Sequence, residues 1–358
     1  MKYLNAINKI SGIGPHKIKL LLNYFSNPEA IWKADISHLK QSGIGEKTAQ
    51  NLFFAKKDIH PETEWKKLEK ENIRILALDD PDYPKLLKES SNPPYLLYIK
   101  GNLDFKEKPA LAIVGSRIYT SYGAQIARQL AKELAQAGII IVSGMAFGID
   151  SFAHLGALEG TGETIAVLGN SLDDKNIYPK DNFNLSRQIM DNGALISEYA
   201  VETSAGPLTF PARNRIIAGL TLGTLVVEAG AKSGALITAR MALEYNREIF
   251  SVPGSIFSSQ SLGTHKLIRQ GAKIVTGVQD ILEELNLKED YRQNKITSKN
   301  PSNPEESKIL KVLSGEPLHI DNISKLAKLQ TTDVNVTLSL MEMKGWVKNI
   351  GGQNYILL

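Results

Sequence analysis

A three-residue motif, Gly115-Ser116-Arg117, places a cation directly after the apolar stretch 110–114. The apolar stretch predicts a buried strand, and the amphipathic segment 122–137 that follows predicts a helix. In an open parallel sheet, ligands bind beyond the carboxyl ends of the strands, where helix N-termini present unpaired N–H groups. The motif therefore indicates an anion site, although an ordinary turn with a solvated arginine has the same local sequence.

Further strand-like stretches end in glycine or in small hydroxyl residues. They cover residues 139–142, 164–168, 194–196, 225–227, 249–252 and 274–275. Each stretch is short, rich in Val and Ile, and apolar on both faces, as expected of a parallel sheet covered by helices. The glycine turns would lie along one edge of that sheet, where the backbone can approach a ligand closely. The fold class predicted is α/β with a Rossmann-like parallel sheet.

Basic residues follow several of these strands, which suits a string of phosphates better than one compact anion. Phe147, Phe152 and Phe210 fall near the same turns, where they either stack unpaired bases or belong to the core. The candidate binding set is Gly115, Ser116, Arg117, Ser143, Gly144, Phe147, Gly148, Lys180, Arg213, Asn214, Arg215, Lys232, Ser233 and Gly234. We expect Arg213 or Arg215 to pair with Glu228 or Asp150.

The sequence lacks the residues that a dinucleotide site, an ATP-binding loop or a metal site requires. Gly115 stands alone after the first strand, and Ser143 replaces the acid that a dinucleotide site requires. No glycine-rich segment has the adjacent Gly-Lys pair of a Walker A loop. The chain has no cysteine, and its six histidines show no metal-ligand spacing. Asp150 and His154 are interpreted as a structural hydrogen-bonded pair. We therefore predict no cofactor, no metal and no enzymatic activity.

A series of motifs in this order closely resembles the bacterial DNA-processing family DprA, also called Smf. The motifs are Gly115-Ser116-Arg117, Ser143-Gly144-Met145-Ala146-Phe147-Gly148-Ile149-Asp150, Tyr178-Pro179-Lys180-Asp181-Asn182, Phe210-Pro211-Ala212-Arg213-Asn214-Arg215, Val227-Glu228-Ala229, Ser233-Gly234-Ala235-Leu236-Ile237-Thr238-Ala239 and Pro253-Gly254-Ser255. The resemblance covers roughly residues 75–285. It implies an extended Rossmann-like domain that binds single-stranded DNA through the candidate binding residues. It also implies that the protein loads the RecA recombinase on this DNA during natural transformation.

The resemblance also implies a homodimer, formed at the sheet edge that closes with residues 261–276. His265, Ile268 and Ile274 are the candidate residues of this dimer and partner edge, and an overlapping surface would contact RecA. His265 departs from the family, which usually has Asn there. Joining two crevices on one strand would also raise avidity for long DNA.

The flanking segments predict two smaller domains. Gly12-Ile13-Gly14 and Gly43-Ile44-Gly45 each precede a helical pattern and resemble helix-hairpin-helix elements. Helical patterns at 304–313, 321–329 and 332–344, followed by two strands about Gly351-Gly352, outline a winged helix. The domains predicted are a helix-hairpin-helix or SAM-like domain at 1–64, the Rossmann-like domain at 65–288, a linker at 289–304 and the winged helix at 305–358.

The winged helix is near neutral, and its presumed recognition helix carries only Asp333, Glu342 and Lys344 as charges. A domain that reads nucleic acid should be basic. We therefore favour a protein-contact or regulatory role for it over DNA binding.

Composition sets the outer limits. The chain has 358 residues, 42% of them hydrophobic, and a formal net charge of +4, so binding must depend on where basic residues cluster. No apolar stretch approaches a membrane span, and we expect a cytoplasmic protein. Two alternative functions stay open. One is a nucleotide-processing hydrolase of the phosphoribohydrolase type, since Gly223 to Glu228 is similar to the strand and acid of those enzymes. The other is an RNA- or nucleotide-sensing module.

Overall fold

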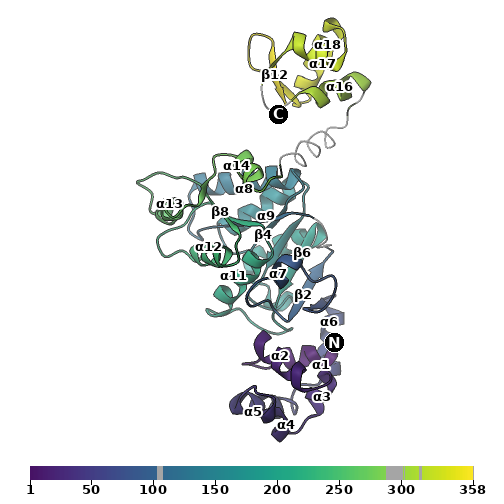
Figure 1. Ribbon diagram of the computed structural model, residues 1–358, viewed down its shortest axis with the longest axis vertical. Helices are drawn as coiled ribbons and strands as arrows, with labels where there is room; N and C mark the ends of the chain where they lie inside the picture. The colour runs from purple at the N-terminus through teal and green to yellow at the C-terminus, as the bar shows by residue number, and fades with distance from the viewer. Residues whose placement is uncertain (103–107, 288–300, 302, 314–316, 358) are drawn as a thin grey trace. The chain divides into compact units, whose positions relative to one another are not determined.

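The computed structural model describes residues 1–102, 108–287, 301, 303–313 and 317–357. The chain divides into two compact units, Met1–Asn286 and Leu287–Leu358 (Figure 1). The first unit contains the helical N-terminal segment and the sheet, and the second contains the winged helix. Among the described residues, no helix is long and apolar enough to cross a bilayer.

The first unit is built on a nine-stranded sheet, counted over the described residues. Its strands are β1 (Arg74–Ala77), β2 (Leu96–Gly101), β3 (Ala110–Val114), β4 (Ile140–Ser143), β5 (Thr164–Val167), β6 (Gly193–Ser197), β7 (Gly223–Val226), β8 (Glu248–Ser251) and β9 (Lys273–Ile274). They lie in the order β1-β2-β6-β5-β4-β3-β7-β8-β9. The pairings from β6 through β9 are all parallel, which confirms the predicted parallel core.

Two strands were not predicted. β1 and β2 form an antiparallel pair, and β2 also runs antiparallel to β6. The chain between them includes α7 (Lys85–Lys88) and returns so that β2 runs beside β1 in the opposite direction. β2 is buried from Leu96 to Lys100. A continuous apolar run of that length does not reveal the direction of the strand.

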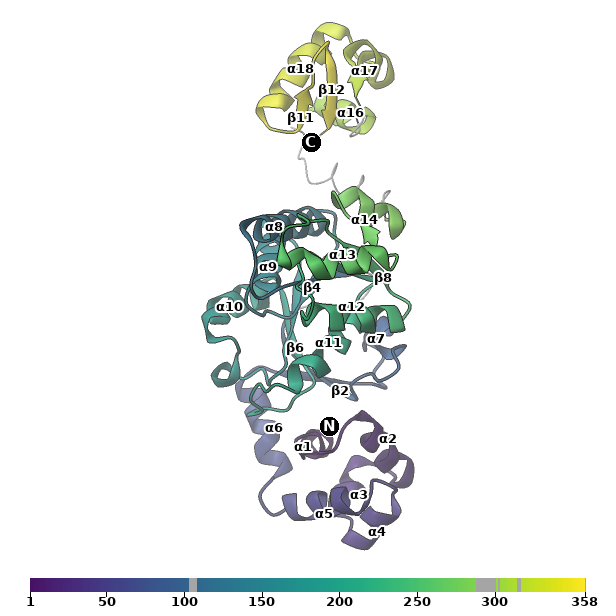
Figure 2. The same ribbon diagram turned by 90° about the vertical axis from the view of Figure 1, so that its left-hand side faces the viewer.

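Helices cover both faces of the sheet (Figure 2). On one face lie α8 (Ser121–Gln136), α9 (Ile149–Glu159) and α10 (Phe183–Asp191), and on the other lie α11 (Thr209–Gly219), α12 (Ala235–Glu244) and α13 (Leu262–Arg269). From β3, the chain first proceeds towards β4, β5 and β6 and later returns to β7 on the opposite side of β3. β3 is therefore the topological switch point, where open α/β sheets bind their ligands.

The buried strands form a continuous apolar layer between these helices. Leu111, Ile113, Ile141 and Leu195 are fully buried, as the double-sided cover requires. α8 and α9 pack closely because Gly156 brings α9 against the backbone of α8. α14 (Val278–Glu284) closes the unit after β9.

The N-terminal segment contains α1 (Lys2–Asn8), α2 (Pro15–Tyr24), α3 (Pro28–Lys33), α4 (Ile36–Gln41), α5 (Glu46–Ala55) and α6 (Pro61–Lys70). Gly12 and Gly43 adopt φ values of +85° and +84° in the turns before α2 and α5, a conformation that favours glycine. The predicted boundary at residues 64 and 65 falls inside α6. Lys9 ties the segment to the sheet domain through Glu202 at 2.9 Å, and it also pairs with Glu64 of α6 at 2.5 Å.

The second unit is a winged helix, as predicted. It contains α16 (Pro304–Val312), β10 (Leu318–His319), α17 (Ile320–Ala327), α18 (Thr331–Met343), β11 (Val347–Asn349) and β12 (Asn354–Leu357). Ile309, Ile323 and Leu338 form its separate core. The two-residue strand β10 was not predicted. Most of the predicted linker 289–304 lies outside the described residues, and the proposed division at 289 and 305 stays a prediction.

Candidate nucleic-acid interface

A crevice of about 740 Å³ opens at the switch point of the sheet. Its walls come from the turn after β3, the first turns of α11 and the loop between β7 and α12. Eight residues of the predicted set line it: Gly115, Ser116, Arg117, Arg213, Asn214, Lys232, Ser233 and Gly234. Gly144 and Phe147 line a smaller hollow that shares Arg117 and Arg213 with the crevice. The structure thus brings together side chains from four separate turns.

Two glycines allow the backbone to pack closely around the crevice. Gly148 has a φ of +83°, and a Cβ there would lie 2.4 Å from the carbonyl oxygen of Ser116. A Cβ on Gly144 would lie 2.4 Å from Nη1 of Arg213. Gly148 therefore supports the site without lining it, and Gly144 leaves room for the arginine.

Arg213 is a buried cation at the base of the crevice. Its Nη1 donates to the carbonyl of Gly144 at 2.8 Å and also to the carbonyl of Val167. Burial lowers the pKa of Arg213 to about 10, although nearby Asp150 opposes the shift. Burial likewise raises the pKa of the Asp150 carboxyl, an effect that Arg213 and the N–H groups of Ala146 and Gly144 oppose. Arg213 thus joins the turns after β4 and β5.

The predicted Asp150–His154 hydrogen bond is wrong. Oδ2 of Asp150 accepts from the N–H of Gly144 at 3.2 Å, whereas Nδ1 of His154 lies 2.7 Å from Oγ1 of Thr164. Asp150 bonds to the loop before α9 and His154 bonds to β5. Both residues therefore have a structural role, as predicted for the pair. Burial lowers the pKa of His154 to about 3, and the positive charge of Arg213 adds to the shift.

Three further residues of the predicted set lie outside the crevice lining. Nη2 of Arg215 pairs with the Glu198 carboxylate at 2.5 Å, so Arg213, not Arg215, is the arginine that lies near an expected partner, Asp150. Ser143 is fully buried and donates to the carbonyl of Ile113 at 2.6 Å. Lys180 is exposed on a short 3-10 helix, Lys180–Asn182, that lies outside both hollows.

The half-buried ring of Phe210 lies beside the Arg117 guanidinium. Its carbon lies 5.2 Å from the ring centre of Phe210, which in turn lies 5.6 Å from the ring of Tyr178. Phe147 is 43% exposed at the edge of the same hollow. Tyr178 was missing from the predicted set, and Phe210 was named only as a ring that either stacks bases or belongs to the core. Their position immediately before a proline in two of the turn motifs was the available signal.

The anion site predicted at the helix after β3 is already occupied by the chain itself. The carboxylate of Glu228 accepts from the backbone N–H of Thr120 at 2.9 Å and from its hydroxyl at 2.5 Å. The Thr120 hydroxyl in turn caps α8 by accepting from the N–H of Gly123. Glu228 is buried and does not line the crevice. The N–H groups of Thr120 and Gly123 at the start of α8 are therefore already bonded within the chain.

The remaining charge on the crevice rim is positive. Arg117 and Lys232 are exposed, and within the described ranges neither forms an ion pair. Asp150 is the single carboxylate among the lining residues, and it is buried against Arg213. Cations and aromatic rings with this placement can bind phosphates and stack unpaired bases.

Comparison with known proteins supplies the family. The family model described as DNA recombination-mediator protein A matches residues 74–286, and a curated Protein Smf from Synechocystis is 36% identical over 99% of this chain and 98% of its own length. The chain belongs to the DprA/Smf family. Models of a SAM-like helix-hairpin-helix tandem and a DprA winged helix match residues 4–58 and 294–353, so each of the three structural regions matches a family model.

Solved DprA structures have the same fold. DprA from Streptococcus pneumoniae matches with a TM-score of 0.68 and 36% identity, covering 79% of this chain and 98% of that one. DprA from Helicobacter pylori matches with a TM-score of 0.54 and 33% identity over 61% and 96% of the two chains. The Helicobacter structure is described by its single-stranded DNA binding mode. The family is one of DNA-binding recombination mediators.

Proposed function

We propose that this DprA/Smf chain binds single-stranded DNA in the switch-point crevice and acts as a recombination mediator that loads RecA. The observation that carries the proposal is the pairing of unneutralised cations, Arg117 and Lys232, with the neighbouring rings of Phe210 and Tyr178. Phosphates would contact the cations, and unpaired bases would stack on the rings. A cytoplasmic location is part of this proposal.

Two kinds of residue make up the proposed contact set. Arg117, Lys232, Ser233 and Gly234 would contact the strand directly, with Lys180 reaching it from beyond the crevice lining. Arg213, Asn214, Gly115, Ser116, Gly144 and Gly148 shape the crevice around these residues. Ser143 and Arg215 are better assigned to the interior, because their polar atoms bond to Ile113 and Glu198.

The deciding experiment is a fluorescence-anisotropy titration with single-stranded DNA, double-stranded DNA and free nucleotides at two salt concentrations. We expect tight binding to single strands that weakens steeply with salt, because counterions are released from each neutralised phosphate. Equal affinity for duplex and single strands, or preferential binding of a free mononucleotide, would overturn the proposal.

The phosphoribohydrolase alternative loses its candidate acid in this structure. Glu228 is buried and bonded to Thr120, and general acid–base catalysis needs a carboxylate within reach of the substrate. We expect no release of adenine from AMP. Stoichiometric release that Glu228→Gln abolishes would favour the hydrolase.

A homodimer at the β9 edge is part of the proposal. β9 is the last strand of the sheet, and its Ile274 is 47% exposed. His265 and Ile268 lie on the neighbouring α13, where Nε2 of His265 is 3.1 Å from the carbonyl oxygen of Gly254. An exposed edge strand is a template for pairing with another chain. An overlapping surface would contact RecA.

Charge on this edge tests the dimer. We expect Ile274→Lys to give a folded monomer that binds long oligonucleotides several-fold more weakly, because the second crevice no longer acts intramolecularly. Short oligonucleotides, which occupy one crevice, should bind as before. Light scattering gives the oligomeric state, and an unchanged melting temperature shows that the fold is intact. A monomeric parent protein with DNA present would contradict the dimer.

A further inference from the structure

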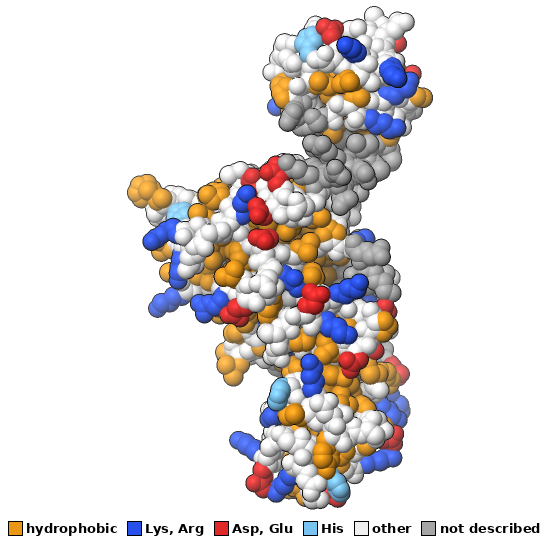
Figure 3. All heavy atoms as spheres, in the orientation of Figure 1, with side chains coloured by type: hydrophobic (Ala, Val, Ile, Leu, Met, Phe, Trp, Pro, Cys, Tyr) orange, Lys and Arg blue, Asp and Glu red, His pale blue; other side chains and the backbone are white. Residues whose placement is uncertain are grey.

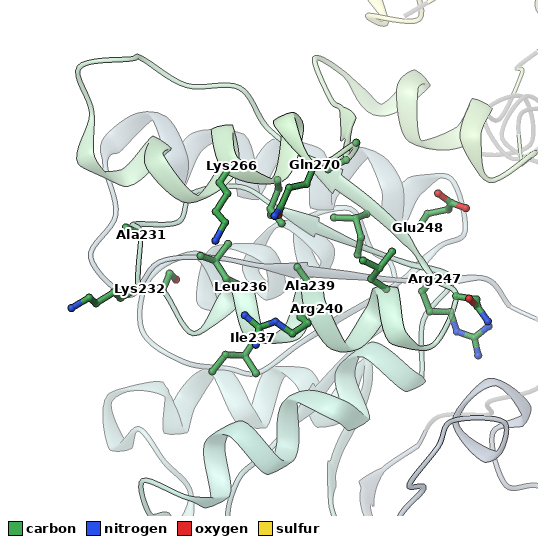
Figure 4. Close-up of a pocket in the computed structure, with 17 residues that line it drawn as sticks. Ala231, Lys232, Leu236, Ile237, Ala239, Arg240, Arg247, Glu248, Lys266 and Gln270 are labelled. Atoms are coloured by element: carbon green, nitrogen blue, oxygen red, sulfur yellow. The ribbon is translucent and has the colours of Figure 1, made fainter.

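A second hollow lies between α12 and α13, next to the crevice. This α12–α13 groove has a volume of about 920 Å³. Figure 4 shows Lys266 extending from α13 towards α12, with Leu236 below it and Arg240 on the α12 side. Leu267 and Gln270 complete the α13 wall. None of the residues predicted from the sequence as DNA contacts, apart from Lys232 and Ser233, belongs to this groove.

The groove is positively charged along most of its length. Lys232, Arg240 and Lys266 are exposed, and within the part of the chain that the structure describes none of them forms an ion pair. Glu248 is the single carboxylate of the lining and lies beside Arg247, away from Lys232 and Lys266 (Figure 4). Lys and Arg side chains gather over α12 and α13 in the space-filling view (Figure 3). A cluster of cations without partners attracts a polyanion.

The α12–α13 groove is continuous with the crevice. Lys232, Ser233 and Ile237 line both hollows, so the two meet at the first turns of α12. The three shared residues include no carboxylate, so a strand bound at the crevice can pass Lys232 and enter the groove without crossing an acidic side chain. The candidate dimer residues His265, Ile268 and Ile274 do not line the groove. The proposed dimer and the groove would therefore use different side chains of the segment 261–276.

The apolar side chains of the groove are aliphatic, and the largest are Leu236, Ile237, Leu243, Ile249 and Leu267. No aromatic residue lines it, in contrast to Phe210 beside the crevice. Base stacking therefore contributes less here than at the crevice, and phosphate contacts dominate. Contacts of that kind do not depend on base sequence.

We propose that the α12–α13 groove is a second binding segment for the same single strand, holding the phosphates beyond those in the crevice through Arg240 and Lys266. This inference rests on the proposed function, because the crevice must hold the first part of the strand. The groove lengthens the site of one subunit without needing a second copy of the chain.

The test compares oligothymidines of about 6 and about 20 nucleotides, the shorter one filling the crevice alone. The double variant Arg240→Ala/Lys266→Ala should bind the shorter oligonucleotide as the parent does and the longer one about tenfold more weakly. Its salt slope for the longer oligonucleotide should fall by about 0.7 for each lost phosphate contact. Lys132→Ala, which removes an exposed cation from α8, is the matched control and should change neither affinity.

A crosslink locates the strand directly. A photoreactive benzoylphenylalanine in place of Gln270, which lines the groove, should crosslink to the longer oligonucleotide and not to the shorter one. Unchanged binding of the longer oligonucleotide by the double variant, or a crosslink to another protein chain in place of DNA, overturns the groove proposal. The second outcome would identify the groove as a protein contact.

Arg117→Ala separates this inference from the proposed function. If Arg117→Ala weakens both oligonucleotides and the double variant weakens neither, the crevice binds DNA and the groove does not. If Arg117→Ala weakens neither, the proposed function itself fails.

Discussion

The crevice and the winged helix are both elements of kinds known to bind nucleic acid, yet their surfaces differ in chemistry. The crevice presents exposed cations beside aromatic rings. The helix α18, in the position of a recognition helix, instead exposes Val336, Leu340 and Met343 at 64%, 46% and 86%. Their spacing of four and three residues puts these apolar side chains on one face of the helix. The type of fold therefore does not by itself identify a surface that binds DNA.

Both regions hold buried charge, but in different places. The crevice is built over Arg213 and Asp150, which are both buried. The winged helix buries the Glu306 carboxylate, which pairs with Lys344 at 2.6 Å, and its exposed cations include Lys325 and Lys348. We therefore expect substitutions beneath the crevice to change stability and substitutions on its rim to change binding.

The largest effect is expected for Arg213→Ala. The change leaves Asp150 without its buried cation and two carbonyl groups without a donor, which should lower the free energy of unfolding by about 3 kcal/mol. Urea denaturation measures the loss. Arg213→Lys should recover only part of it, because a single ammonium group cannot reproduce the fork of the guanidinium. A change below about 1 kcal/mol would contradict the structural role of this arginine.

Acid should destabilise the sheet unit through His154. Its pKa is lowered to about 3 in the folded chain from an ordinary value of 6.5, so the unfolded chain binds one more proton between these values. Stability is therefore fully present above pH 6.5 and is lost as the pH falls towards 3, by up to about 1.4 kcal/mol per pH unit. His154→Gln should flatten this dependence.

Native-state hydrogen exchange at several pH values reports the sheet unit and the winged helix separately. The contribution of His154 should be visible only in the sheet unit. A pH dependence identical in the parent and in His154→Gln would show that other groups control acid sensitivity.

On the rim of the crevice, Arg117→Ala should weaken binding of single strands about tenfold and lower the salt slope by about 0.7, with no change in the melting temperature. Lys232→Ala and Lys180→Ala should have smaller effects in the same direction. Anisotropy titrations with strands of different base composition should show equal losses, because phosphate contacts carry no sequence information. Loss confined to one base composition would indicate base readout instead.

The smallest effect is expected in the winged helix. Lys325→Ala/Lys348→Ala removes two exposed cations from that unit and should change the affinity for single strands by less than about twofold. A loss as large as that of Arg117→Ala would remove the distinction between the two regions. The same titration as for Arg117→Ala provides the comparison.

Much of the fold could be predicted because the apolar strands and the glycine turns are local signals. The rim residues Arg117 and Lys232 were identifiable in the same way, since each directly follows or closely follows a strand. The partners of buried charges were not. Arg215 pairs with Glu198 from the turn after β6, and Asp150 accepts from backbone N–H groups, choices that depend on side-chain direction in three dimensions. The direction of β2 could not be predicted either, because β2 is buried as continuously as the parallel strands are.

The bond between Glu228 and Thr120 has a consequence for which ligands this fold accepts. In dinucleotide-binding proteins, a pyrophosphate occupies the N-terminus of the helix after the first strand. Here a carboxylate of the same chain lies at that place, and a tethered competitor acts at a high effective concentration. A free nucleotide must displace it before its phosphates reach those amides. A long polyanion that is bound at many points along the outer rim does not have to displace Glu228. The Glu228 carboxylate therefore disfavours nucleotide cofactors and leaves the binding of polymers unaffected.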